Sequence, residues 1–334
     1  MIAMNLPSAS RLVGEGVLNI NKEAGWTSHD VVARVRRALR GIKVGHAGTL
    51  DPAATGVLPI LIGKGTRIAE YLLHWDKEYR AVLRLGETTD TLDATGTVLD
   101  RCSLDQVAEN DIREAVSAFK GRIQQVPPMY SAVKVQGVPL YKTARQGRVI
   151  DRAAREVVIQ ELHIDRIVGR DVHLRVRCSK GTYIRTLCAD IGAKLGVGGH
   201  LLALERSKAG PLVVERAITV EEFERQLQAG EVSSSLMPLD AALARWPACR
   251  VGPETARAVL HGVPVPLSLV MEWDGRSDPS RLHEEPIRIK DAEGRLLAIG
   301  TLCSANGLNP EGRSNERIAI RKVLMSEETA TCVS

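Results

Sequence analysis

The stretch "GHAGTLDPAATG" (Gly45–Gly56) places one acidic residue, Asp51, among glycines, small residues and a proline. This composition predicts a loop rich in turns. No second carboxylate, cysteine or serine–histidine pair stands beside Asp51 in the stretch. An Asp-Pro step of this kind usually forms an Asx turn, so a chemical role for the carboxylate requires a partner from elsewhere in the chain.

A candidate partner lies in "CSKGTYIRTLCADIG" (178–192). Apolar residues recur there at helical spacing, namely Ile184, Leu187, Cys188, Ile191 and Leu195. This spacing puts Arg185 in the first turn of a helix, where a cation opposes the positive end of the helix dipole and calls for an anion. Asp51 is a candidate for that anion. The alternative is that Arg185 is an exposed arginine in a basic patch.

Strand-like and amphipathic helical segments alternate on both sides of the Asp51 loop. We expect strands at 17–21, 57–62, 79–85 and 172–178, and helices at 28–40, 66–73, about 105–120 and 183–195. The alternation predicts an α+β or mixed α/β domain.

A second, smaller domain is predicted after the proline-containing stretch "LMPLDAALARWPACRVGPE", which suggests a boundary near residue 250. Beyond it, "PIRIKDAEGRLLAIGTL" predicts two strands around a turn, and "ERIAIRKVL" predicts a further strand. The C-terminal part is therefore expected to be β-rich.

Bulk properties restrict the class of protein. The chain of 334 residues is long enough for one large and one small domain. It has no run of about 18 apolar residues, and its start lacks the basic and apolar regions of a signal peptide, so we expect a cytoplasmic protein without a membrane span. The six cysteines are scattered, which favours free thiols over disulfides or a zinc site.

The charge is distributed unevenly along the chain. Residues 1–250 contain 35 Lys and Arg against 28 Asp and Glu, whereas 251–334 contain 10 against 12. The larger part is therefore the better candidate for binding a polyanion.

Two basic segments carry much of this positive charge. The predicted helix 28–40 has an apolar face, a capping box of Thr27 and Asp30, and Gly41 at its end; its arginines lie off the apolar face at positions 34, 36, 37 and 40. Arg175 and Arg177 form the polar face of a predicted strand. A polyanion-binding surface and a solvated arginine-rich face are both open interpretations.

Two further motifs are weak. "GKGT" at 63–66 does not match a phosphate loop, because Gly65 follows Lys64 and position 59 is a proline. A nucleotide-dependent enzyme that uses this segment is a third possibility, which a failure to bind ATP would dismiss. Asp90 and Asp93 in "TDTLDATG" have a spacing that suits a divalent cation, but turn-forming residues surround them and no third acidic ligand is near, so we interpret the segment as a structural loop.

Four stretches in order, "GHAGTLDPAATGVL", "KEYRAVLRLGETTDTLDATG", "VPPMYSAVKVQG" and "CSKGTYIRTLCADIG", resemble the TruB family of bacterial tRNA pseudouridine-55 synthases. The resemblance is close over about residues 15–215 and loose beyond. It implies a pseudouridine synthase fold, α+β with a mixed, largely antiparallel sheet flanked by helices, and a small PUA-like C-terminal β-barrel. It also implies isomerisation of uridine 55 in the T loop of tRNA on a flipped-out base, without a cofactor or metal.

The same resemblance assigns the catalytic residues. Asp51 matches the nucleophilic aspartate, which is ionised at neutral pH at its ordinary pKa, and Arg185 would keep it so in a desolvated pocket. Tyr79 matches a tyrosine that lies against the flipped base and is a candidate for removing the proton from C5. From the residues alone, Tyr79 is predicted to be a half-buried strand aromatic.

Three more residues are assigned to substrate binding. Tyr183 and Leu204 match positions that line the uracil pocket, and His46 matches a histidine that interacts with the tRNA loop near the flipped nucleotide. From the residues alone, Leu204 would be core and His46 undecided. One departure is Lys22 followed by Glu23, where the family usually has Lys-Pro; we interpret Lys22 as structural.

We therefore expect a flexible N-terminus at 1–14, a catalytic domain at 15–247, a PUA-like RNA-binding domain at 248–326 and a tail at 327–334. The expected partner is tRNA, bound through its T arm, with the acceptor stem as a further candidate contact of the C-terminal domain and the protein acting as a monomer. The C-terminal part departs from this picture in its negative charge and in an insertion, "LSLVMEWDGRSDPSRLHEEP".

The alternative function is a non-catalytic RNA-binding protein or tRNA-folding chaperone that uses the same basic surface. The set of Asp51, Tyr79 and Arg185 favours the enzyme, because a chaperone would not need all three residues.

Overall fold

The computed structural model of the chain describes residues 14–131, 133–135, 137–144, 146–148, 150–274, 282, 285–308 and 314–325. The expected flexible N-terminus, apart from Gly14, the expected tail and part of the insertion lie outside these residues. The chain forms two compact units. The first contains residues 18–60 and 72–235, and the second contains 14–17, 61–71 and 236–334. The domain bounds expected from the sequence stay a prediction.

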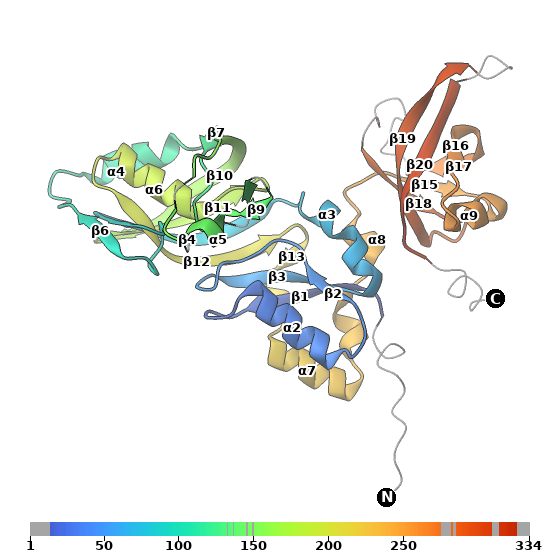
Figure 1. Cartoon of the computed structure of the whole chain (residues 1–334), viewed down its shortest axis with the longest axis horizontal. Coiled ribbons are helices and arrows are strands. Elements are labelled where there is room, and N and C mark those ends of the chain that lie inside the picture. The colour runs from blue at the N-terminus through green and yellow to red at the C-terminus, as the bar shows by residue number, and fades with distance from the viewer. Residues whose placement is uncertain are drawn as a thin grey trace, which may run out of the picture. The chain divides into compact units, whose positions relative to one another are not determined.

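A large mixed sheet forms the centre of the first unit (Figure 1). Its strands follow the order β1-β3-β12-β4-β11-β10-β7, with β2 beside β3 and β13 beside β12. Their bounds are β1 (Gly16–Lys22), β2 (Val44–His46), β3 (Thr55–Ile62), β4 (Lys77–Leu85), β7 (Gly121–Gln125), β10 (Arg155–Val168), β11 (Asp171–Cys178), β12 (Gly199–Ala209) and β13 (Leu212–Val213). The pairs β7–β10, β10–β11, β11–β4 and β4–β12 are antiparallel and β12–β3 is parallel, which confirms the predicted mixed, largely antiparallel sheet.

Helices pack against two regions of this sheet (Figure 1). α4 (Glu109–Ser117) and α6 (Ile184–Lys194) lie near β10, β11 and β4, and their apolar residues join one core with those strands. α2 (Ser28–Ala38) and α7 (Val220–Ala229) contact each other near β1 and β3. Arg34 of α2 forms ion pairs with Glu221 (3.0 Å) and Glu224 (2.8 Å) of α7.

Local sequence signals determine the ends of the helices. Thr27 and Asp30 form the predicted capping box at the start of α2, and Arg40 and Gly41 adopt positive φ after its end. The helix predicted at 183–195 is also confirmed as α6. The helix predicted at 66–73 is shorter, because a 3-10 turn (Gly63–Ile68) precedes the four-residue helix α3 (Ala69–Leu72).

Two long strands, β10 and β12, were not predicted. The register between β12 and β4 shifts twice, between Leu201 and Ala203 and between Arg206 and Lys208. β10 has two such irregularities in its pairing with β11. A bulge shifts the inward and outward alternation by one residue, so the two-residue period by which a strand is recognised is interrupted.

The second unit is built on a six-stranded, barrel-like sheet with the order β16-β20-β19-β18-β15-β17. Its strands are β15 (Ala248–Val251), β16 (Val265–Pro266), β17 (Val270–Trp273), β18 (Pro286–Lys290), β19 (Leu296–Leu308) and β20 (Ser314–Val323), with helix α9 (Pro253–Leu260) and the short elements α8 (Leu239–Ala242) and β14 (Leu236–Met237). The three strands predicted between residues 286 and 323 are confirmed as β18, β19 and β20. None of the helices in the described part of the chain is long and apolar enough to cross a membrane.

A close backbone contact joins β3 to β12 and yields a test of the fold. Gly56 has a φ of +98°, and a Cβ atom there would lie 2.3 Å from the carbonyl oxygen of Arg206. Gly121 has a similar φ of +100°, but a Cβ atom there would meet no other atom within 4 Å, so it serves as a matched control.

We expect Gly56→Ala to reduce the free energy of unfolding by about 3 kcal/mol or more, because the strain of positive φ adds to a backbone clash. Gly121→Ala should cost only about 1 to 2 kcal/mol, the strain alone. Urea denaturation followed by circular dichroism measures both. Equal losses in the two variants would contradict the close contact.

Candidate active site

A cavity of about 530 Å³ opens between β4, β12, the start of α6 and the loop that carries Asp51. Five of the six predicted site residues line it: Asp51, Tyr79, Tyr183, Arg185 and Leu204. They come from four separate segments of the chain, so the cavity exists only after the first unit has folded.

The Asp51–Arg185 ion pair lies in this cavity, and it confirms the predicted partnership. Arg185 Nε lies 3.0 Å from Asp51 Oδ2. The arginine side chain is 6% exposed, whereas the aspartate is 41% exposed. A molecule that enters the cavity therefore meets the carboxylate and not the guanidinium.

Other groups hold the guanidinium of Arg185 in place. Its Nη2 donates to the carbonyl oxygen of Tyr130 (2.7 Å), and its Nη1 donates to that of Thr91 (3.4 Å) and lies 3.5 Å from Asp93 Oδ2. A guanidinium with partners on every side has little rotational freedom. The fixed guanidinium of Arg185 therefore orients the carboxylate of Asp51.

The role of Asp93 was missed in the sequence. Its Oδ1 accepts from the hydroxyl of Thr91 (2.8 Å) and from the backbone N–H of Thr95 (3.0 Å), which agrees with the structural loop that we predicted. Its Oδ2 lies near the guanidinium of Arg185, so Arg185 faces a second carboxylate in addition to that of Asp51. Within the described ranges, no group of three His, Cys, Asp or Glu side chains is arranged to hold a metal ion.

The environment of Asp51 shifts its pKa upward. Burial raises the pKa of the carboxyl most, the charge of Arg185 lowers it, Asp93 raises it again, and Lys22 lowers it slightly. The net direction is above the ordinary value. Arg185 thus acts in the direction that we expected, but it offsets the effect of burial only in part.

Tyr79 lies on β4, and its side chain is 9% exposed, more buried than the half-buried aromatic that we predicted. Burial raises the pKa of its phenol, and the positive charge of Arg206 is the largest opposing influence. Leu204, the partner of Ala81 across the β4–β12 ladder, is partly buried beside the same core. Tyr183 is the residue that precedes α6, and burial raises its pKa as well.

His46 is the one predicted site residue that does not line the cavity. It lies on β2, and its ring packs edge-to-face on that of His29 at 5.6 Å between centroids. Burial lowers the pKa of His46, and the nearby charges of His29 and Arg206 lower it further. Its assignment to tRNA contact stays a prediction.

Lys22 supports the loop that carries Asp51. Its side chain is fully buried, and its ammonium donates to the carbonyl oxygens of Glu23 (2.9 Å), Trp26 (2.8 Å) and Pro52 (3.1 Å). Burial lowers the pKa of Lys22 to about 8. These contacts support the structural interpretation of Lys22, although Glu23 occupies the position where the family usually has proline.

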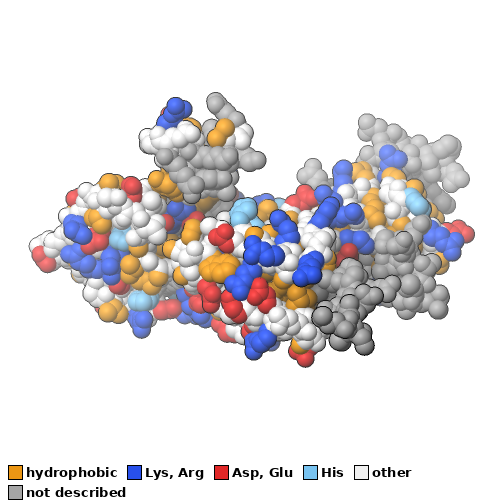
Figure 2. Space-filling view, turned by 60° about the horizontal axis from the view of Figure 1, so that its bottom comes forward, with side chains coloured by type: hydrophobic (Ala, Val, Ile, Leu, Met, Phe, Trp, Pro, Cys, Tyr) orange, Lys and Arg blue, Asp and Glu red, His pale blue; other side chains and the backbone are white. Residues whose placement is uncertain are grey.

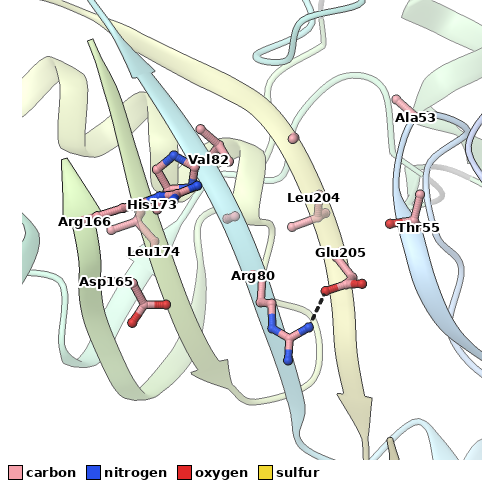
Figure 3. A pocket seen from close by; sticks show the side chains of 12 residues that line it. Ala53, Thr55, Arg80, Val82, Asp165, Arg166, His173, Leu174, Leu204 and Glu205 are labelled. Carbon is pink, nitrogen blue, oxygen red and sulfur yellow. Dashed lines mark hydrogen bonds and ion pairs between the residues drawn. The ribbon is translucent and has the colours of Figure 1, made fainter. Parts of the chain in front are cut away.

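The arginines on the polar face of β11 lie on the opposite side of the sheet, and they are paired. Arg175 contacts Asp165 (2.6 Å), and Arg177 contacts Glu161 (3.1 Å). On the same face, Arg80 forms an ion pair with Glu205 (2.8 Å) in a shallow hollow of about 510 Å³ (Figure 3). This charge compensation removes the support that Arg175 and Arg177 gave to polyanion binding.

Two of the cations at the cavity are not compensated in this way. Arg155 and Lys180 line the cavity, and among the residues that the structure describes neither has a carboxylate within 4 Å. The ammonium of Lys180 lies 3.0 Å from Nε2 of His74. On α2, Arg36 donates to the carbonyl oxygen of Val44 (2.9 Å), while Arg37 is exposed. Figure 2 shows basic and acidic side chains in adjoining patches on one face, so total charge alone does not locate a binding surface.

Solved structures share this fold. The chain aligns with a protein in the "Crystal Structure of a Cbf5-Nop10-Gar1 Complex" with a TM-score of 0.72 and 30% identity, covering 94% of this chain and 86% of the other. It also aligns with a chain in the "Structure of H/ACA RNP bound to a substrate RNA containing 2'-deoxyuridine", with a TM-score of 0.69 and 27% identity over 94% and 86%.

Two family models match residues 36–244, a range that includes every residue lining the cavity. The model described as TruB family pseudouridylate synthase (N terminal domain) matches residues 36–184, and the one described as tRNA pseudouridylate synthase B C-terminal domain matches 185–244. The chain therefore belongs to the TruB family of pseudouridylate synthases.

The chain matches curated relatives over nearly their whole length. A tRNA pseudouridine synthase B from Geotalea uraniireducens (strain Rf4) is 44% identical over 285 residues, 85% of this chain and 91% of that protein. The protein of the same name from Thermobifida fusca (strain YX) is 44% identical over 296 residues, with coverage of 86% and 94%.

The contacts of Lys22 generate a prediction for stability. Lys22→Met removes a buried ammonium and leaves three carbonyl groups without their donor, so we expect the free energy of unfolding to fall by about 2 to 4 kcal/mol. Lys120→Met, at an exposed position, should change it by less than about 0.5 kcal/mol. The two variants are compared by their urea denaturation midpoints. An unchanged midpoint for Lys22→Met would contradict a structural role for Lys22.

Proposed function

We propose that this protein isomerises uridine 55 in the T loop of tRNA to pseudouridine, with Asp51 as the nucleophile on a flipped-out base. The observation that supports this most is the accessible carboxylate of Asp51, held by the buried Arg185 at one wall of a cavity. Membership of the TruB family, and the name tRNA pseudouridine synthase B among its relatives, agree with that chemistry.

The reaction needs only one carboxylate as its nucleophile. The N1–C1′ bond breaks, a C5–C1′ bond forms, one proton leaves C5 and one is gained at N1, so the atoms balance without a second substrate. The carboxylate adds to the nucleotide, holds the intermediate and then leaves. Hydrolytic sites that activate a water molecule usually need a second acid or base, which this reaction does not require.

The raised pKa of Asp51 is compatible with this role. A carboxylate in a desolvated site loses the water that would stabilise it and becomes a better nucleophile, provided that it stays ionised. Arg185 supports ionisation by opposing the effect of burial. The site therefore combines desolvation with a fixed counter-charge.

The cavity has the size and lining for one flipped nucleotide. Its volume of about 530 Å³ lies within the range of small-ligand sites. Tyr79, Tyr183 and Leu204 provide ring faces and an apolar surface against which a base extracted from its stack can pack. We propose that these three side chains hold the uracil while Asp51 reacts.

Uncompensated cations mark the proposed path of the RNA. Arg155 and Lys180 at the cavity are available for phosphates, and Arg36 and Arg37 of α2 are further candidates. We further propose that the protein acts as a monomer, contacts the T arm through the first unit and reaches the acceptor stem with the second.

Replacement of the nucleophile tests the function directly. We expect Asp51→Asn to abolish release of tritium from C5-labelled uridine in a T-arm transcript, because the amide keeps the shape of the side chain and loses its nucleophilicity. The affinity for the transcript should stay within a few-fold. Asp165→Asn, which removes a carboxylate from the other face of the sheet, is the matched control and should retain activity. Turnover by Asp51→Asn would refute the mechanism, and binding without turnover by the unmodified protein would favour an RNA-folding chaperone.

Tyr79 allows stacking and proton transfer to be separated, since phenylalanine keeps the ring and removes only the hydroxyl. We expect Tyr79→Phe to lower the single-turnover rate by about a hundredfold or more with nearly unchanged affinity, because the hydroxyl takes part in removing the C5 proton. Tyr71→Phe is the control at a tyrosine outside the cavity. A rate for Tyr79→Phe within about threefold of the unmodified protein would leave Tyr79 only a stacking role, to which the hydroxyl does not contribute.

The distribution of paired and uncompensated cations predicts the salt dependence of tRNA binding. Arg155→Gln combined with Lys180→Gln should reduce the slope of log affinity against log salt by about one to two, since up to two phosphate contacts are lost. Arg175→Gln combined with Arg177→Gln should leave the slope unchanged because both arginines already face carboxylates. Filter binding over a range of salt concentrations measures the slopes, and the reverse pattern would place the RNA on the other face of the sheet.

A further inference from the structure

Arg206, which has no assigned role, is a buried cation at the wall of the cavity. It lies on β12 with 1% of its surface exposed, and it is among the largest fully buried side chains of the described residues. Its Cα partner across the β4–β12 ladder is Tyr79, and both side chains line the cavity. Arg206 thus stands beside the one phenol that the proposed reaction uses.

Three hydrogen bonds connect Arg206 to the chain around Asp51. Its Nε donates to the carbonyl oxygen of Val57 (2.6 Å), its Nη2 to that of Gly48 (3.0 Å), and its Nη1 more weakly to that of Thr49 (3.5 Å). These carbonyls lie on both sides of Asp51 in the sequence. The guanidinium therefore joins the two ends of the loop that carries the nucleophile.

The backbone of Arg206 adds a second connection to the same loop. Arg206 pairs with Gly56 in the parallel ladder between β12 and β3. The side chain and the backbone of Arg206 thus both hold the loop from residue 48 to residue 57. The position of Asp51 therefore depends on Arg206.

The charge of Arg206 lacks a direct counter-ion in the part of the chain that the structure describes. Among the described residues no carboxylate lies within 4 Å of it, whereas Arg185 in the same cavity has Asp51 and Asp93. Buried arginines are normally paired, so an arginine without a facing carboxylate leaves its positive charge to act on neighbouring groups.

Tyr79 is one of those neighbours. The charged or titratable groups that act on its phenol are Arg206, Cys178 of β11 and Asp51. Of these three groups, Arg206 lowers the pKa of Tyr79, while Cys178 and Asp51 raise it together with burial. A positive charge next to a phenol in a poorly solvated site favours the ionised oxygen.

We propose that Arg206 is a positioning residue that holds the Asp51 loop in place and stabilises negative charge on the phenol oxygen of Tyr79. Its consequence for catalysis depends on the function proposed above. Its effect on Tyr79 does not, because that effect is a property of the free protein.

The first experiment uses the free protein without RNA. The five tyrosines are replaced by 3-fluorotyrosine, the Tyr79 signal is assigned by its absence in Tyr79→Phe, and its ¹⁹F shift is titrated with pH. Arg206→Met should move the titration midpoint of Tyr79 upward by about one pH unit or more, whereas Arg206→Lys, which keeps the charge, should move it by much less. An unchanged midpoint in Arg206→Met overturns the inference.

Arg80→Met is the matched control. Arg80 is adjacent to Tyr79 on β4, but its side chain points to the other face of the sheet and contacts Glu205 there (Figure 3). Its removal should leave the Tyr79 midpoint in place. Dispersed ¹⁹F signals from the other tyrosines show that a variant is folded, and Arg206→Gln provides a second neutral variant if Arg206→Met does not fold.

The second experiment measures single-turnover isomerisation of a tRNA transcript. We expect Arg206→Met to lower the rate by about a hundredfold with affinity within a few-fold, and Arg206→Lys to recover part of the loss. In a Tyr79→Phe background the same substitution should cost less, because the part of its effect that acts through the Tyr79 hydroxyl is already absent and only the part that acts through the Asp51 loop remains.

The outcomes of the two experiments separate the two proposals. Equal rate losses in both backgrounds would overturn the action of Arg206 through Tyr79. An unmodified protein that isomerises no tRNA would refute the proposed function, while the titration of Tyr79 would still decide the inference about Arg206.

Discussion

The burial of Arg185 is the constraint on which the organisation of the site depends. A guanidinium that is 6% exposed must find anions and carbonyl groups within the protein, because water cannot solvate it. Its partners Asp51, Asp93, Thr91 and Tyr130 come from three loops that are distant in the sequence. The start of α6 therefore draws these loops together, and the same contacts leave the Asp51 carboxylate as the exposed member of the pair.

The buried cations around the Asp51 loop follow a common principle. Lys22 and Arg206 donate to backbone carbonyls on either side of Asp51, and neither forms a direct ion pair with any residue in the described part of the chain. Carbonyl dipoles satisfy the donors without cancelling the charge, so a cation can hold a loop and still influence titratable groups nearby. Arg175 and Arg177, on the other face of the sheet, show the opposite arrangement, since facing carboxylates neutralise their charges.

This division of charge agrees with the proposed isomerisation. A reaction that only rearranges one nucleotide needs a fixed nucleophile, a surface for the base and little further machinery. The cavity provides these through Asp51 and the side chains of Tyr79, Tyr183 and Leu204. The two-sided support of the Asp51 loop by Lys22 and Arg206 is the kind of rigid surrounding that keeps a nucleophile in a productive position.

The sequence by itself determined the features that depend on neighbouring residues: the capping box of α2, the apolar spacing of α6, the C-terminal strands and the electrostatic need for an anion at Arg185. Only the tertiary structure decided the course of β12, because bulges break its alternation, and with it the position of Arg206 beside Tyr79. It also decided the second carboxylate on Arg185 and the direction of the pKa shift of Asp51. Spacing along the chain encodes local structure, whereas burial and the distances between charges arise from segments that meet only in the folded protein.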